Sequence, residues 1–156
     1  MDSIFAAAVK SLKPSIDRLL QLQPIKNGNL PHVMPERGVY LLSEGSKHLY
    51  VGRSNDLRGR YGRHCKPNAT HRMAAFAFRL AREATGKLKA SYKKGPDSRD
   101  GLMMNANFRA AFDAAKARIR AMDYRFVAED DQVRQALLEI YVAVVLKTPY
   151  NDFNNH

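Results

Sequence analysis

Residues 38–52 read GVYLLSEGSKHLYVG, and this stretch decides how the chain folds. Two short β-type runs, residues 39–42 and residues 47–51, lie on either side of the polar sequence Ser-Glu-Gly-Ser at residues 43–46. Apolar and β-branched runs around a glycine-containing polar turn are typical of a β-hairpin. Both runs carry a tyrosine, and an arginine-rich stretch follows them directly.

The two tyrosines of this hairpin are expected to share one face. If residues 44–46 form a three-residue loop, Ser43 pairs with Lys47, and counting back places Tyr40 directly opposite Tyr50. A change of one residue in that register would send the two phenols to opposite faces. Phenols beside guanidinium groups indicate phosphate chemistry.

Apolar spacing elsewhere predicts helices and a third strand. The expected helices are two short ones within residues 3–22, separated near Pro14, and residues 57–64, 71–84, 108–122 and 132–146. Residues 124–128 alternate like a strand. Residues 24–37 are rich in proline, glycine and asparagine and predict a linker, and the lysine-rich residues 86–107 predict a mobile basic loop.

The charge of the chain points to a polyanionic partner. At 156 residues the chain has the length of about one domain, and it has a net charge of +11 and a pI near 10.0. Between residues 52 and 100, 13 Lys or Arg stand against 4 Asp or Glu, a net of +9. A basic surface of this strength attracts nucleic acid or an anionic membrane.

Several classes of protein are disfavoured by what the sequence lacks. The single cysteine, Cys65, leaves no intrachain disulfide and no multi-cysteine zinc site, which favours a hard divalent cation. No apolar run approaches the roughly 18 residues of a spanning helix, and Asp2 stands where a signal peptide would carry lysines. We therefore expect an intracellular, cytoplasmic protein without a membrane partner.

Glu139 is the second informative residue, because it is the one carboxylate in the apolar run of residues 136–146. An ionised carboxylate beside a packed face is costly to desolvate unless a cation or several donors compensate. A structural ion pair with an arginine is one interpretation. In the company of arginines and paired tyrosines, metal-assisted attack on a phosphodiester is the other.

Taken together, these positions resemble the GIY-YIG nucleases. The family is named after two short motifs on adjacent strands, and residues 38–40 (GVY) and 50–52 (YVG) match both, with nine residues between them. Members then carry a basic residue after the second motif, an arginine on the first helix, a glutamate on a later helix and a final asparagine. The matching positions here are Arg53, Arg60, Glu139 and Asn151.

The resemblance implies an α+β fold, in which a small, three-stranded, mainly antiparallel sheet is flanked by helices. It covers residues 38–151, so that residues 38–156 are expected to form the nuclease domain. Residues 1–37 would be an N-terminal helical extension and linker. A basic insertion at about residues 86–107 departs from the family pattern.

The resemblance also implies hydrolysis of DNA at one divalent ion per active site. Glu139 would be the only protein ligand of Mg²⁺ or Mn²⁺. Tyr40 would contact or deprotonate the attacking water, and Tyr50 would support the same water or the phosphate. Arg60 would stabilise charge that develops on phosphate oxygens, and Asn151 would hold the site together by hydrogen bonds.

His64 lies one helical turn after Arg60, and a histidine at this place adds to the active site in some restriction enzymes of the family. A surface histidine is the alternative interpretation. The basic residues expected to contact nucleic acid are Arg53, Arg58, Arg63, Lys66, Arg72, Lys93 and Lys94.

Endonucleolytic cleavage of double-stranded DNA is therefore the expected function, and the restriction type is favoured because the chain is short. A palindromic site would require two active sites, hence a homodimer or a transient pair on DNA. A DNA repair or mobile-element nuclease of the same fold is an alternative, and so is a nucleic-acid-binding protein that does not cleave. A membrane-surface protein would rest on the N-terminal segment, far from the basic residues.

Overall fold

The computed structural model describes residues 2–87 and 95–154, and it contains two compact units. Met1–Arg58 and Met122–His156 form the first, which we call the sheet unit, and Gly59–Ala121 form the second, the helical unit. Lys93 and Lys94, two expected nucleic-acid contacts, lie outside the described residues.

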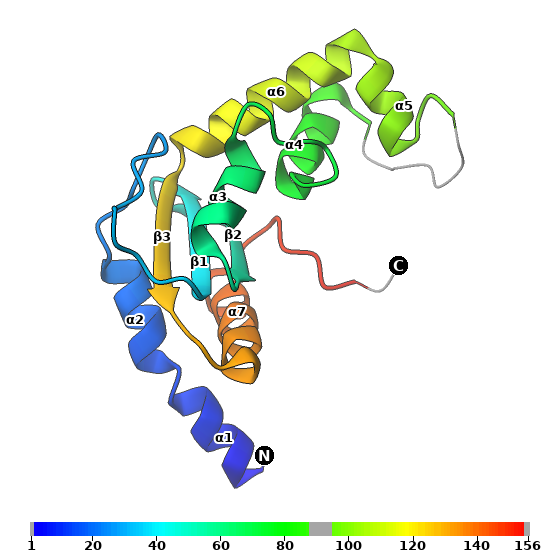
Figure 1. Cartoon of the computed structure of the whole chain (residues 1–156). Coiled ribbons are helices and arrows are strands. Elements are labelled where there is room, and N and C mark those ends of the chain that lie inside the picture. Colours follow the sequence, from blue (N-terminus) through cyan, green and yellow to red (C-terminus); the bar gives the residue numbers. More distant parts are fainter. Residues whose placement is uncertain (1, 88–94, 155–156) are drawn as a thin grey trace. The chain divides into compact units, whose positions relative to one another are not determined.

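Three antiparallel strands form the sheet of the first unit. They are β1 (Gly38–Glu44), β2 (Lys47–Ser54) and β3 (Asp123–Ala128), and their order is β2-β1-β3, so β1 is central (Figure 1). The strands fall where the apolar alternation places them. The α+β class and the small antiparallel sheet are thereby confirmed.

The hairpin between β1 and β2 is tighter than the sequence suggests. Glu44 pairs with Lys47, which leaves a two-residue turn in which Gly45 adopts φ +60°, a conformation that glycine adopts without steric cost. The predicted three-residue loop with Ser43 opposite Lys47 is therefore wrong. The pairing then shifts by one residue between Leu42 and Ser43.

These two one-residue changes add up to a register that differs from the prediction by two. Tyr40 lies opposite Gly52, and Tyr50 lies opposite Leu42, so the prediction that the two tyrosines are direct partners is wrong. Because side chains alternate with a period of two, an even shift leaves both tyrosines on one face.

The opposite face of the sheet carries the core of this unit. Helices α2 (Lys13–Gln21) and α7 (Gln132–Leu146) pack against it, and α1 (Ser3–Lys10) precedes α2. The two short N-terminal helices are confirmed, with Pro14 in the first turn of α2, where a proline is tolerated. The core consists of Leu12, Ile16, Leu19, Val39, Leu41, Val51, Val127, Leu138, Val142 and Ala143.

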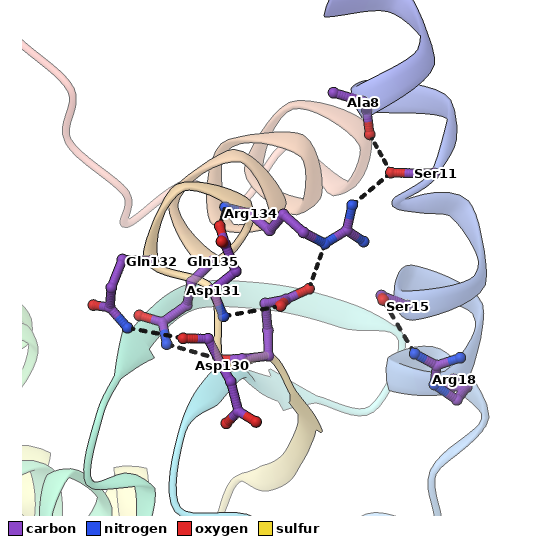
Figure 2. A network of polar contacts seen from close by, with 10 residues as sticks. Ala8, Ser11, Ser15, Arg18, Asp130, Asp131, Gln132, Arg134 and Gln135 are labelled. Atoms are coloured by element: carbon purple, nitrogen blue, oxygen red, sulfur yellow. Dashed lines mark hydrogen bonds and ion pairs between the residues drawn. The ribbon is translucent and has the colours of Figure 1, made fainter.

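Polar contacts also join the N-terminal helices to α7 (Figure 2). Arg134 pairs with Glu129 at 3.0 Å and donates a 2.6 Å hydrogen bond to Oγ of Ser11, whose hydroxyl in turn donates to the carbonyl of Ala8. Asp131 caps α7 by accepting from the backbone N–H of Arg134. Residues 1–37, the expected extension, thus contribute both apolar and polar contacts to the sheet unit.

The helical unit contains most of α3 (Leu57–Cys65) together with α4 (Ala75–Thr85), α5 (Arg99–Met104) and α6 (Ala106–Ala121) (Figure 1). Helices α4 and α6 pack against each other through aromatic rings. The centroid of the Phe78 ring lies 5.1 Å from that of Phe108 and 6.4 Å from that of Phe112. In the part of the chain that the structure describes, no helix combines the length and apolar character that a bilayer crossing requires.

Two predictions for this unit need correction. Helix α4 begins at Ala75, later than the predicted residue 71, because residues 70–74 form a turn with backbone hydrogen bonds to Thr70. The expected loop at residues 86–107 contains α5, whose cap Ser98 accepts a 3.0 Å hydrogen bond from the N–H of Gly101.

Candidate active site

Tyr40 and Tyr50 lie together on the sheet face that α2 and α7 leave uncovered. Their ring centroids are 6.2 Å apart, and the ring of Tyr124 lies 5.8 Å from that of Tyr40 on its other side. Tyr40 is 1% exposed, whereas Tyr50 is only partly buried. The prediction that both phenols share a face is confirmed, and Tyr40 occupies the more enclosed position.

Gly52 is the residue that allows Tyr40 to adopt this position. A Cβ atom at Gly52 would lie 2.3 Å from the Tyr40 hydroxyl oxygen and 2.4 Å from Cζ, well inside van der Waals contact. The hydroxyl end of Tyr40 therefore lies directly against the β2 backbone. The final glycine of the second motif leaves room for the tyrosine of the first.

Glu139 forms an ion pair with Arg53, the residue after Gly52. The distance between Arg53 Nε and Glu139 Oε2 is 3.3 Å, and the Glu139 side chain is 22% exposed. Burial raises the pKa of Glu139, and the guanidinium of Arg53 acts in the opposite direction. The sequence left open an ion pair or a metal ligand, and the structure contains the ion pair.

The phenol and the carboxylate approach β2 from opposite faces of the sheet. Val39 and Leu41 belong to the core under α7, so Tyr40 between them points to the other face, while Arg53 lies on the α7 side. The Tyr40 hydroxyl and the Glu139 carboxylate thus lie next to Gly52 and Arg53, two consecutive residues of β2.

Glu139 has the chemistry that the implied ion requires. Mg²⁺ and Mn²⁺ prefer oxygen ligands, and Mg²⁺ commonly uses one or two carboxylates and several waters. A partly exposed carboxylate whose ionised form is disfavoured by burial gains from a nearby cation. Within residues 2–87 and 95–154, no three His, Cys, Asp or Glu side chains gather in one group, so a metal here would depend on Glu139 and water.

Gln135 is a site residue that the sequence reasoning missed. It lies one helical turn before Glu139 on α7, is 1% exposed, and accepts a 3.3 Å hydrogen bond from Nη1 of Arg53. Its amide nitrogen donates to the carbonyl of Glu129 at 3.0 Å and to Oδ1 of Asn55 at 3.3 Å. The available signal was a polar residue four positions before Glu139.

Asn151 binds the outer edge of β2. Its side-chain amide accepts from the backbone N–H of Val51 at 2.9 Å and donates to the carbonyl of Val51 at 2.7 Å. The N–H of Tyr150 donates to the carbonyl of Leu49 at 3.1 Å. The asparagine thus satisfies both backbone groups of the central residue of the second motif, as a neighbouring strand would do.

We expect Asn151→Ala to loosen β2. The change removes two hydrogen bonds at a sheet edge and should lower the free energy of unfolding by about 1–3 kcal/mol. Hydrogen exchange should accelerate at the backbone amide of Val51, which donates a hydrogen bond to Oδ1 of Asn151 in the wild type. Asn154→Ala, in the same C-terminal segment but exposed, is the matched control. Unchanged protection of Val51 in Asn151→Ala would contradict this role.

Arg60 and His64 belong to the helical unit. Nη1 of Arg60 donates to the carbonyl of Met73 at 3.1 Å. His64 is 1% exposed, with its ring edge-on to Phe76, so it is not the surface histidine of the alternative interpretation. Burial lowers the pKa of His64 to about 3, and the charges of Arg60 and Arg63 add to this effect. The imidazole is therefore neutral at neutral pH.

The remaining expected nucleic-acid contacts differ in their surroundings. Arg58 donates to the carbonyls of Pro31 and His32 in the linker, and Arg72 pairs with Asp100 at 3.0 Å. Lys66 is exposed just after α3. Arg63 lies on α3 and is partly buried. Their predicted contact with DNA stays a prediction.

His64 predicts a loss of stability in acid. The unfolded chain protonates an imidazole near pH 6.5, whereas the folded chain keeps His64 neutral down to about pH 3. The unfolded state thus binds more protons between these values, and the free energy of unfolding should fall by about 1.4 kcal/mol per pH unit as the pH drops below 6.5.

Chemical denaturation of the wild type and of His64→Gln between pH 7 and pH 4 measures this contribution. His32→Gln, at an exposed histidine, serves as the control and should keep the wild-type slope. Equal acid slopes for the wild type and for His64→Gln would mean that another group causes the acid sensitivity.

Comparison of the chain with protein-family models, with curated proteins and with solved structures gives no match. The resemblance to GIY-YIG nucleases therefore rests on the residues and spacings of the chain itself.

Proposed function

We propose that the chain is a divalent-metal-dependent endonuclease that hydrolyses phosphodiester bonds of double-stranded DNA, as its resemblance to the GIY-YIG nucleases implies. One observation carries the proposal. The Tyr40 hydroxyl lies against Gly52, and the neighbouring Arg53 pairs with the partly buried Glu139. A phenol, a guanidinium and a carboxylate are the types of group that metal-assisted phosphodiester hydrolysis uses.

In this proposal Tyr40 acts as a phenolate: its hydroxyl proton is first lost to solvent, and its oxygen then accepts a proton from the attacking water. The rings of Tyr50 and Tyr124 restrict where the Tyr40 ring can move, which fixes the position of the water and lowers the entropic cost of attack. Tyr50 is the more accessible phenol and supports the same water or the phosphate.

Glu139 would hold Mg²⁺ or Mn²⁺, with waters completing the shell. When bound, the ion neutralises charge on the scissile phosphate and polarises its oxygens. Arg53 limits the mobility of the Glu139 carboxylate, and Gln135 holds Arg53 in turn. Arg53 can also exchange its partner for a phosphate oxygen, since its side chain is 40% exposed.

The resemblance assigns to Arg60 the stabilisation of phosphate oxygens that become more negative in the transition state. His64 acts as a neutral group, because its pKa of about 3 excludes a stable imidazolium at neutral pH. Asn151 keeps Val51, the middle residue of the second motif, in place.

Incubation of plasmid DNA with the protein and Mg²⁺ tests the proposal. Discrete fragments that disappear with Glu139→Ala and with Arg60→Ala would support a site-specific, restriction-type nuclease. Glu83→Ala, at an exposed carboxylate of α4, is the control and should cleave like the wild type. Random nicking would exclude a site-specific, restriction-type nuclease. DNA binding without cleavage under any divalent ion would favour the non-catalytic alternative.

A restriction-type nuclease that cuts a palindrome would act as two copies. Light scattering of the protein with and without a cleaved duplex, in Ca²⁺ to prevent hydrolysis, should then show two chains per duplex. One chain per duplex would favour a nuclease of the repair or mobile-element type.

A further inference from the structure

The net charge of the chain is divided unequally between the two units. The helical unit contains 15 Lys or Arg and 4 Asp or Glu, a net charge of +11. The sheet unit contains 11 of each and has no net charge. The whole positive excess therefore belongs to the unit that carries neither the tyrosine pair nor Glu139.

In the sheet unit, cations are used internally. Lys26 pairs with Asp123 at 3.1 Å, Arg53 with Glu139 at 3.3 Å, and Arg134 with Glu129 at 3.0 Å. Each of these pairs holds two segments of the unit together. The 11 carboxylates of the unit balance its 11 Lys and Arg, so the unit offers an external polyanion no net attraction.

In the helical unit, four carboxylates cannot neutralise 15 cations. Asp100 already forms ion pairs with His71 and Arg72. Asp97 and Asp113 each form an ion pair with a lysine. Lys66 and Arg109 are exposed, and neither has an ion-pair partner among the residues that the structure describes. Unpaired, exposed cations are the groups that bind phosphates and release counterions.

A buried lysine of the helical unit holds the backbone segment that follows α3 in place. Lys116 is 4% exposed, and its Nζ donates to the carbonyls of Pro67 at 2.7 Å and Ala69 at 2.9 Å. This buried contact fixes the segment that follows α3, where Lys66 lies. The backbone from which the Lys66 side chain extends therefore needs no further ordering when the unit binds a phosphate.

We propose that the DNA-binding surface of the chain lies on the described part of the helical unit, residues 59–87 and 95–121, and that it binds the duplex backbone without help from the divalent ion or from Glu139. The inference rests on the proposed function for the choice of substrate. An anionic membrane is disfavoured because Met73 and Met104 are the only large apolar side chains found exposed among the described residues of this unit, and surface binding to a bilayer requires an apolar face.

Fluorescence anisotropy with a random-sequence duplex in EDTA tests this inference on the full chain. Lys66→Gln/Arg109→Gln removes two charges from the helical unit, and Lys10→Gln/Lys47→Gln removes two exposed charges from the sheet unit. Both variants have the same net charge, so only the position of the lost charges differs. Thermal melting verifies that both fold.

We expect the helical-unit variant to bind roughly tenfold more weakly and to lose about two units of slope in log Kd against log salt. The sheet-unit variant should change the Kd by less than about twofold, and Glu139→Ala, which removes a negative charge, should bind at least as tightly as the wild type. Equal weakening by both double variants, or by neither, would overturn the inference. Vesicles with phosphatidylserine that bind as tightly as the duplex would overturn it in favour of a membrane partner.

A different result would overturn the proposed nuclease function. A chain that binds the duplex through the helical unit but cuts no DNA in Mg²⁺ or Mn²⁺ would end the proposed function and leave this inference standing.

Discussion

Glu139→Gln is expected to reduce DNA cleavage by about a thousandfold while leaving the unfolding temperature equal to or above that of the wild type. Burial raises the pKa of Glu139, so the folded chain holds its proton more tightly than the unfolded chain does. Above that raised pKa the ionised carboxylate costs stability. Glutamine keeps the shape and removes the charge, and Arg53, at 40% exposure, can be solvated when its partner is lost.

Thermal melting with and without Mn²⁺ gives a measurement that is independent of cleavage. A metal that binds only the folded chain raises the unfolding temperature of the wild type, and Glu139→Gln should lose this increase. Glu129→Gln is the matched control. The Glu129→Gln substitution weakens the ion pair with Arg134 and should lower the unfolding temperature. The molecules that remain folded should still cleave DNA. A destabilised Glu139→Gln variant that keeps its activity would contradict the assignment of Glu139.

The sequence was sufficient for the elements of the sheet unit, because apolar periodicity is strong there. The helix predicted at residues 132–146 has the bounds of α7, and the third strand begins one residue before its predicted start. Each of these segments buries one face, and the spacing of apolar residues in the sequence reflects which face is buried. The helix α5 was missed because its six residues are too few for a periodic signal.

The hairpin register could not be read from the same periodicity. Alternation gives the face of each side chain, and it gave the shared face of Tyr40 and Tyr50 correctly. It does not determine the length of a turn or the position of an irregular pair, and both differed here by one residue. The two differences added to an even number, which is why the inference about the face survived.

The contacts of the candidate site were less predictable than its residues. Arg53 was interpreted as a phosphate contact, yet in the structure it pairs with Glu139 and donates to Gln135. The burial of His64 depends on neighbours such as Phe76, 12 residues further along the chain. Pairings between distant segments arise from tertiary packing, which a local pattern does not contain.

Gly52→Ala is expected to affect stability and cleavage together. The added methyl group would lie 2.3 Å from the Tyr40 hydroxyl and 2.8 Å from its Cε1. Tyr40 is 1% exposed between the rings of Tyr50 and Tyr124, so its ring cannot swing away. Overpacking of this kind costs about 1–3 kcal/mol. If Tyr40 positions the water, a displacement of about 1 Å should reduce cleavage by about 100-fold.

Chemical denaturation and plasmid cleavage measure the two effects of Gly52→Ala, and Gly62→Ala is the control. A methyl group at Gly62 would meet only the flexible Lys66 side chain, at 3.0 Å, and alanine favours a helix by up to about 1 kcal/mol. In the double variant Gly52→Ala/Tyr40→Leu, the smaller side chain leaves room for the methyl group. The loss of stability should then be smaller than the sum of the single losses. Additive losses would mean that contact with Tyr40 is not the reason for glycine at position 52.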